Sequence, residues 1–289
     1  MLAASRSHPA GTRQLGHKDQ RDALAWLARH PVRDVFLASR ILNDGALGPT
    51  GWSPLWGMHD RGGLRGILHV GPNLVPAVDD LEVLVAFTRV ALGPGPTRML
   101  LGEQEAVAAL WALVRHTYPA PREVRDCQYV YALRPEQLAA GLQRLHHGRA
   151  RLAAADDEDE VLELSAAMYQ EEMGENPLAR DPAGYRRRIR VLTGRGWTYV
   201  YDLGGRIAFK MDVGCASDLT AQIQGVYVPP ELRGRGVASA AMAACCALAF
   251  DRHPTLSLYV NDFNRPAVAL YERLGFRREP YNFQTIMLP

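Results

Sequence analysis

Hydrophobic and polar positions in the first half of the chain predict alternating helices and strands. Apolar residues recur at helical spacing over residues 21–42, with a break near Pro31, because proline cannot continue a helix. Residues 53–71 carry two short apolar runs around Gly62-Gly63, a pattern typical of a β-hairpin. The same reasoning predicts a helix over 78–92, a strand, turn and helix over 97–117, and a strand over 127–133.

The second half predicts a different order of the same elements. Two helices over 160–174 and 184–195 precede a hairpin over 198–214, a strand over 220–228, an alanine-rich helix, a strand over 255–260, a helix over 265–274 and a final strand. Gly225 inside its strand indicates a bulge or a close backbone approach. Between the halves the composition moves from basic to acidic, so we place a boundary near residue 150 and expect domains at 1–150 and 151–289.

Bulk composition narrows the functional classes. The chain has 289 residues, 47% of them hydrophobic, and a net charge of +2, which supports buried cores and gives no overall field toward nucleic acid or anionic lipid. The basic run at 184–195 alternates with apolar residues, as a solvated helix face does. No apolar run reaches membrane-spanning length, and the first sixteen residues lack the apolar core of a signal peptide, so a cytoplasmic protein without membrane contact is expected. The four cysteines form no CxxC pair, which argues against a metal site or a disulfide framework.

A glycine- and arginine-rich turn is the strongest chemical signal. After the strand over 220–228, Arg233, Gly234, Arg235 and Gly236 open a helix. The unsatisfied N–H groups at a helix start, with two flexible glycines and two cations, favour binding of a phosphate or pyrophosphate. A P-loop would need a lysine and a hydroxyl, and a dinucleotide fingerprint would need a glycine where Ser239 stands. A tight structural turn between strand and helix is the alternative interpretation.

Two motifs in the same order and spacing point further. Arg233, Gly236 and Ala238 match the pattern Gln/Arg-x-x-Gly-x-Gly/Ala, and the later stretch matches Asn-x-x-Ala-x-x-x-Tyr-x-x-x-Gly-Phe at Asn264, Ala267, Tyr271, Gly275 and Phe276. In both motifs, residues 151–289 resemble the GNAT acetyltransferase superfamily. The resemblance implies an α/β fold with a mixed, mostly antiparallel sheet flanked by helices. Residues 1–150 echo the element order without the glycine turn, so two tandem GNAT-like domains, the first degenerate, are expected.

The resemblance also implies a cofactor site, for acetyl-CoA as cosubstrate and without a metal. Acetyl-CoA would lie between the strand ending at Val228 and the strand ending near Val260. The backbone of Val226, Tyr227 and Val228 would pair with the pantetheine arm and polarise the thioester carbonyl. Asn264 is assigned either a cofactor contact or an N-cap role. The pyrophosphate would be held by Arg233, Gly234, Arg235, Gly236, Val237, Ala238 and Ser239.

Catalytic candidates follow from the same resemblance. The phenol of Tyr271 would donate a proton to the departing CoA thiolate, with a packed core tyrosine as the alternative. The central strand offers only Gln222 and Gln224, which cannot accept a proton at neutral pH. Glu171 and Glu172 are therefore the candidate bases, together with Glu175 or a water chain to bulk solvent, and plain surface charges are the alternative.

The predicted activity is transfer of an acetyl group from acetyl-CoA to a primary amine by direct attack. A non-catalytic acyl-CoA-binding or partner-docking module is the competing hypothesis, and an intact glycine turn with Tyr271 favours catalysis. The partner would be an amine acceptor, either a small molecule or a peptide or protein, with no nucleic acid or membrane. A monomer or a homodimer is expected.

Overall fold

The computed structural model describes residues 11–47, 54–93, 97–142 and 147–289. The first ten residues, on which the expectation about a signal peptide partly depends, lie outside this set. The chain divides into two compact units that interleave along the sequence. The first contains Met1–Val130, Tyr259–Phe263 and Arg278–Pro289, and the second contains Tyr131–Leu258 and Asn264–Arg277. The proposed boundary near residue 150 stays a prediction.

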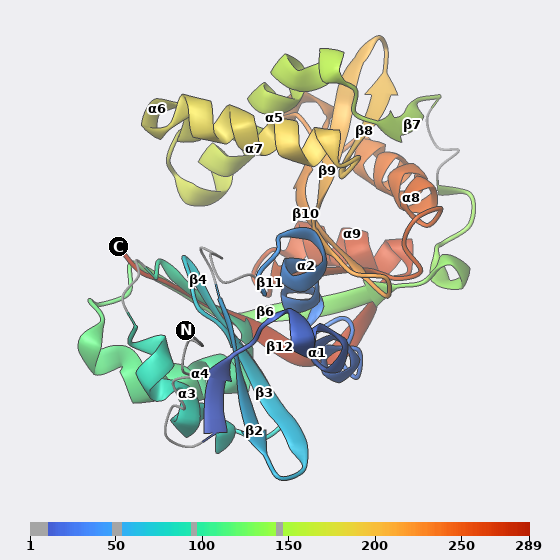
Figure 1. Ribbon diagram of the computed structural model, residues 1–289. Coiled ribbons are helices and arrows are strands. Elements are labelled where there is room, and N and C mark those ends of the chain that lie inside the picture. The colour runs from blue at the N-terminus through green and yellow to red at the C-terminus, as the bar shows by residue number, and fades with distance from the viewer. Residues whose placement is uncertain (1–10, 48–53, 94–96, 143–146) are drawn as a thin grey trace. The chain divides into compact units, whose positions relative to one another are not determined.

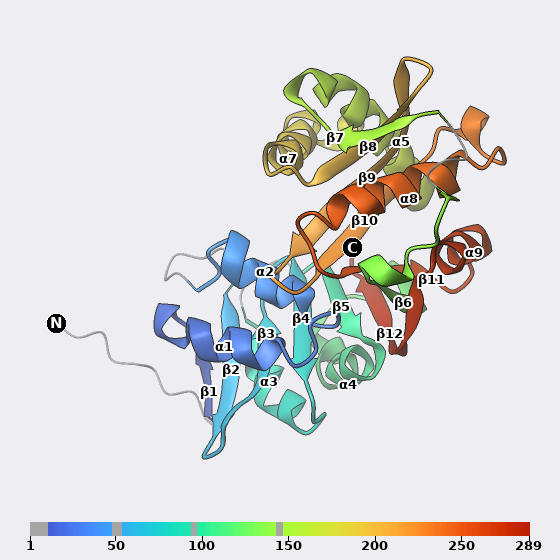
Figure 2. The same ribbon diagram turned by 90° about the vertical axis from the view of Figure 1, so that its right-hand side faces the viewer.

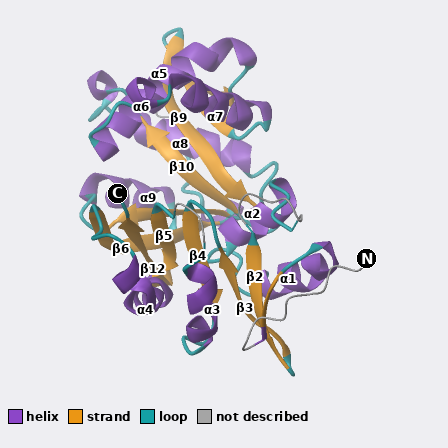
Figure 3. Ribbon diagram, turned by 60° about the vertical axis from the view of Figure 1, so that its left-hand side comes forward, coloured by secondary structure: helices purple, strands orange, loops and turns teal. Residues whose placement is uncertain are grey.

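The first unit is a sheet with helices on both faces (Figures 1 and 3). Its strands follow the order β1-β2-β3-β4-β5-β12-β6. Neighbours β1 to β4 pair antiparallel, whereas β4 and β5 are parallel. The elements are β1 (Thr12–Gln14), α1 (Gln20–Leu27), α2 (Val35–Asn43), β2 (Leu55–Asp60), β3 (Gly63–His69), β4 (Asn73–Val78), α3 (Val83–Ala91), β5 (Met99–Glu103), α4 (Gln104–Val114), β6 (Glu123–Leu133) and β12 (Arg277–Met287).

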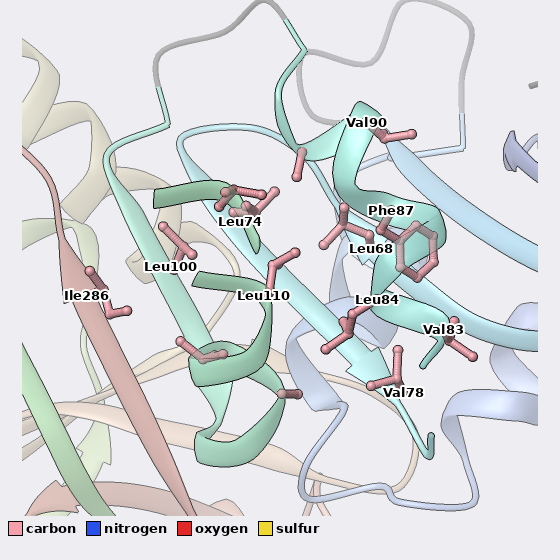
Figure 4. Packing of buried hydrophobic residues seen from close by; sticks show 14 of the residues in the cluster. Leu68, Leu74, Val78, Val83, Leu84, Phe87, Val90, Leu100, Leu110 and Ile286 are labelled. Atoms are coloured by element: carbon pink, nitrogen blue, oxygen red, sulfur yellow. The ribbon is translucent and has the colours of Figure 1, made fainter. Parts of the chain in front are cut away.

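Alternation along the strands builds a core on each face of this sheet. Ile67 packs with α1 and α2, while its neighbour Leu68 packs with α3 and α4, because successive strand residues point to opposite faces. Figure 4 shows the second of these cores, where Phe87 and Leu84 of α3 meet strand residues. Ile286 of β12 also belongs to it, so the last strand of the chain completes the first unit's core.

Two expectations for this unit need comment. The helix over 21–42 is interrupted, as predicted: α1 ends at Leu27 and α2 begins at Val35. The predicted helix over 78–92 is wrong at its start, because residues up to Val78 form β4 and α3 begins only at Val83. Asp80 separates the two elements, and its carboxylate accepts a hydrogen bond from the N–H of Glu82 at 2.9 Å. β4 itself was missed because Pro76 interrupts its apolar run.

The second unit has the strand order β11-β10-β9-β8-β7. Here β7 pairs antiparallel with β8, β8 with β9, and β9 with β10, whereas β10 is parallel to β11. The predicted hairpin turns at Gly204-Gly205, both with φ in the left-handed region (63° and 80°). The elements are β7 (Arg149–Leu152), α5 (Glu158–Met173), α6 (Pro177–Arg180), α7 (Pro182–Gly194), β8 (Thr198–Leu203), β9 (Arg206–Ala216), β10 (Ala221–Tyr227), α8 (Val237–Ala249), β11 (Leu256–Asn261) and α9 (Arg265–Leu274).

Helices cover both faces of this second sheet (Figure 2). On one face α5 and α7 bury an apolar cluster that includes Val161, Ile189 and Val200. On the other face lies α8, which is built almost wholly of small residues, so its backbone packs closely against the strands. Nine of its thirteen residues are buried. The predicted mixed, mostly antiparallel sheet flanked by helices is therefore confirmed for each unit.

Candidate functional site

The parallel strands β10 and β11 pair at their beginnings. Cα partners are found at Ala221–Leu256 and Gln222–Ser257, and β10 pairs with β9 as far as Tyr227. The register with β9 shifts between Gln224 and Tyr227, and Gly225 adopts φ +62°. The bulge predicted at Gly225 is therefore present. A bulged strand bends and twists more strongly, and this bulge lies directly before the turn that leads into α8.

The turn after β10 presents the start of α8. Gly234 and Gly236 have φ of +72° and +78°, a region that side-chain-bearing residues rarely adopt. Gly236 is the N-cap of α8, which therefore starts at Val237. The side chains of Val237 and Ser239 are buried, so these residues can offer a ligand only their backbone N–H groups. Arg235 is exposed beside them. The geometry suits an anion.

Arg233, the other predicted pyrophosphate ligand, contacts the end of α5. Its Nη2 donates to both carboxylate oxygens of Glu171 at 3.0 and 2.9 Å, and its Nε donates to the carbonyl of Val228 at 2.8 Å. The hydroxyl of Tyr227 donates to the same carboxylate at 3.0 Å, and the guanidinium lies over the Tyr227 ring. The structure thus brings together Arg233, Tyr227 and the candidate base Glu171. A carboxylate holding these donors is poorly placed to take a proton from an amine.

Tyr271 lies on α9 with a side chain that is almost fully buried. Burial raises the pKa of its phenol well above the usual value, and the negative charge of Glu172 raises it further. The phenol therefore stays protonated at neutral pH, as a general acid must. Aromatic contacts with Tyr131 and Phe276 fix the ring.

Asn264 has the N-cap role that was one of its two predicted functions. Its Oδ1 accepts a hydrogen bond from the N–H of Ala267 at 3.3 Å at the start of α9. Pro266 follows at a position where a missing N–H costs little. The contact with a cofactor stays a prediction. The remaining acid of the group, Glu175, is ion-paired with Arg180 at the limit of 4.0 Å.

A buried charge pair under the bulge was missed by sequence reasoning. Lys210 and Asp212 lie on β9, and Lys210 Nζ donates to Asp212 Oδ2 at 2.7 Å and to Ser165 Oγ of α5 at 2.9 Å. Thr198 of β8 donates to Asp212 Oδ1 at 3.0 Å. The side chains of Lys210 and Asp212 are 0% and 6% exposed. The available signal was two opposite charges two residues apart within an apolar strand, which places both on one face.

The first unit has a corresponding pair of parallel strands. Its strands β4 and β5 pair at Asn73–Met99 and Leu74–Leu100. The turn that follows β4 carries acids in place of the glycines and arginines, including Asp79, and these acids repel a pyrophosphate. The buried Arg33 donates to Asp79 at 3.0 Å and to Glu103 at the end of β5 at 3.3 Å. An ion cluster therefore occupies this position in the first unit.

Within residues 11–47, 54–93, 97–142 and 147–289, no three or more His, Cys, Asp and Glu side chains gather as they would around a metal ion. No helix among the same residues is both long and apolar enough to cross a membrane.

Comparison with known proteins gives family matches for both halves. Residues 159–276 match the acetyltransferase (GNAT) family, and residues 53–153 match a family described as a domain of unknown function (DUF4081). The chain is 37% identical over 103 residues to a mycothiol acetyltransferase of Salinispora arenicola, a match that covers 35% of this chain and 28% of that protein. It is 30% identical over 128 residues to a mycothiol acetyltransferase of Clavibacter sepedonicus, covering 43% of this chain and 40% of that protein. The chain thus spans less than half the length of these relatives.

Solved structures confirm the fold over nearly the whole chain. A tandem GNAT protein from the clavulanic acid biosynthesis pathway, solved without acetyl-CoA, covers 96% of this chain and 98% of its own length, with a TM-score of 0.54 and 14% sequence identity. At this identity the likeness concerns the fold alone. It agrees with the repeated element order and with the parallel strand pair that each unit contains.

Proposed function

We propose that the GNAT-family domain formed around residues 159–276 transfers an acetyl group from acetyl-CoA to a primary amine. One observation carries the proposal: the bulge of β10 at Gly225 comes directly before a glycine turn that exposes the start of α8. We expect the bulge to leave backbone groups of β10 available to an extended pantetheine arm. The turn supplies N–H groups and a positive helix end for the pyrophosphate.

The reaction needs few groups beyond this scaffold. The neutral amine attacks the thioester carbonyl carbon and forms a C–N bond, and the electron pair of the carbonyl moves onto its oxygen. Backbone N–H groups of Val226 to Val228 would stabilise that oxyanion. When it collapses, the C–S bond breaks, and the thiolate takes the phenolic proton of Tyr271.

Glu172 is the base that we assign to the amine proton. Glu171 already accepts hydrogen bonds from Arg233 and Tyr227, and the negative charge of Glu172 is one cause of the raised pKa of the Tyr271 phenol. A base that takes up the proton of the amine would balance the proton that Tyr271 donates. A carboxylate would also attract an ammonium group before it loses its proton.

A small-molecule amine is the acceptor class that we propose. Two relatives of the domain are named mycothiol acetyltransferases, so an amine related to mycothiol is the first acceptor to test. The matched regions, at 37% and 30% identity, cover less than half of this chain. The acceptor screen should therefore also include amino acids and short peptides.

Calorimetric titration of acetyl-CoA tests the proposal. The wild-type protein should bind it, and Gly236→Glu should abolish binding by placing a carboxylate and a strained backbone at the start of α8. Gly204→Glu is the matched control, because Gly204 has the same left-handed backbone but lies in the β8–β9 turn. No binding by the wild-type protein would contradict the proposal. Binding without turnover of any amine would instead support an acyl-CoA-binding module.

A further inference from the structure

We infer that Lys210 and Asp212 are positioning residues for acetyl transfer, which hold the bulge of β10 against the thioester. The inference rests on the proposed function. The pair is buried, spans the bulge and touches its glycine, and it has no part in the acid and base chemistry assigned above.

The pairing of β10 with β9 shows where the bulge lies relative to the ion pair. Gln224 of β10 is the partner of Asp212, and Tyr227 is the partner of Lys210. Three residue steps along β10 therefore lie opposite two steps along β9. The ion pair between Lys210 and Asp212 is formed along the two-step side, on the face that carries Ser165 of α5. The ion pair therefore lies opposite the segment of β10 that contains the extra residue.

The ion pair also lies against Gly225, the glycine of the bulge. A Cβ atom built on Gly225 would lie 2.6 Å from Asp212 Oδ2 and 3.3 Å from Lys210 Nζ. The carboxylate therefore packs against the Cα of the bulged glycine at a distance that no side chain allows. The φ of Gly225 is +62°, in the left-handed region that residues with a side chain rarely adopt. The charge pair and the glycine fit each other.

Hydrogen bonds hold both charges of the pair in place. Both carboxylate oxygens of Asp212 accept hydrogen bonds, from Thr198 and from Lys210, and Lys210 also donates to Ser165. These partners lie on β8, β9 and α5, so three elements fix the two charges. A carboxylate engaged in this way is a poor base. A buried ion pair adds little stability over apolar residues of the same volume, so a gain in precise geometry accounts better for its presence.

Infrared spectroscopy of bound acetyl-CoA tests the inference before any acceptor is known. The probe is acetyl-CoA with a ¹³C-labelled thioester carbonyl, whose stretching frequency falls when hydrogen bonds polarise it. The variant is Lys210→Met with Asp212→Asn, which removes both charges at nearly constant volume and leaves neither unpaired. The control is Arg151→Met with Asp157→Asn and Asp202→Asn, which removes the ion pairs that Arg151 forms with both carboxylates, away from the bulge. Thermal melting verifies that both variants fold.

The expected result separates binding from polarisation. The downward shift of the carbonyl frequency should shrink in the Lys210/Asp212 variant and persist in the control, while affinity for free CoA changes little in either. With an active acceptor, kcat should fall by about 10² with little change in KM, as for loss of an oxyanion donor. Should the Lys210/Asp212 variant keep the full frequency shift, the inference is wrong and the proposed function stands. No binding of acetyl-CoA by the wild-type protein contradicts the proposed function itself.

Lys210→Arg with Asp212→Glu provides a rescue test. This variant keeps both charges on the same face but alters their lengths. If the pair merely stabilised the fold, rescue would restore thermal stability and kcat together. We expect stability to recover more fully than the carbonyl shift, because the contact with Gly225 depends on the short aspartate side chain.

Discussion

Arg233 and Glu171 form an ion pair of 2.9 Å at the site assigned to the pyrophosphate. The pair links the turn after β10 to the end of α5, and Tyr227 supports it with a further hydrogen bond. A guanidinium that binds Glu171 has fewer donors left for a phosphate. An anionic cofactor would therefore compete with Glu171 for Arg233.

Glu171→Gln should tighten acetyl-CoA binding modestly. Neutralising the carboxylate releases Arg233 for the pyrophosphate, and because both side chains are nearly half exposed, solvent screening limits the gain to about threefold. Calorimetry measures the change, with Glu175→Gln as the control for loss of an acid from the same region. The variant should also keep its turnover, since we assign the base role to Glu172. A large loss of kcat in Glu171→Gln would return that role to Glu171.

Tyr271→Phe should lower kcat by about 10² while acetyl-CoA still binds, because only the proton donor is lost. Tyr199→Phe is the matched control, as Tyr199 is a fully buried tyrosine of the same unit. Steady-state rates with an active amine measure the effect. Since burial raises the pKa of Tyr271, the alkaline fall in kcat that follows ionisation of this phenol should lie above pH 10. Equal rates for Tyr271→Phe and the wild-type protein would make Tyr271 a packed core residue.

The sequence predicted the parts of this site that depend on local chemistry. Gly225, Gly234 and Gly236 stand out because their backbone conformations exclude other residues. Asn264 could be assigned as an N-cap from its place before a proline-containing helix start. Each of these signals lies within a few residues of its effect, so one sequence was enough to find it.

Contacts between distant segments could not be predicted in the same way. Arg233 and Glu171 are 62 residues apart, and Lys210 finds Ser165 at a separation of 45. No periodicity specifies such partners. The last strand shows the same limit: β12 follows the GNAT-like segment in sequence, yet Ile286 packs in the first unit's core. Only the register of β12 against β5 reveals this placement.

One molecule of acetyl-CoA should bind per chain. Each unit contains a pair of parallel strands, but the turn after β4 carries Asp79 and Asp80, and Arg33 joins Asp79 to Glu103. Negative charge at this position opposes a pyrophosphate. Calorimetry with protein of known active fraction gives the stoichiometry. A second site that survives Gly236→Glu would show that the first unit also binds the cofactor.

The first unit should lose stability in mild acid because of His69. Burial lowers the pKa of its imidazole to about 4, although Nδ1 lies 2.7 Å from the carbonyl oxygen of Asn73. The unfolded chain takes up this proton near pH 6.5, so between pH 6.5 and about 4 protons favour unfolding, and the contribution of the neutral ring is complete only above pH 6.5. The loss should approach about 3 kcal/mol at the acid end of that range.

Denaturant unfolding at a series of pH values measures the effect of His69. His69→Gln should flatten the dependence between pH 4 and pH 6.5, because the replacement does not titrate there. His116→Gln, at an exposed position after α4, should leave the slope unchanged. An unchanged slope in His69→Gln would mean that other groups of the first unit, such as His59, whose pKa burial also lowers, account for the acid sensitivity.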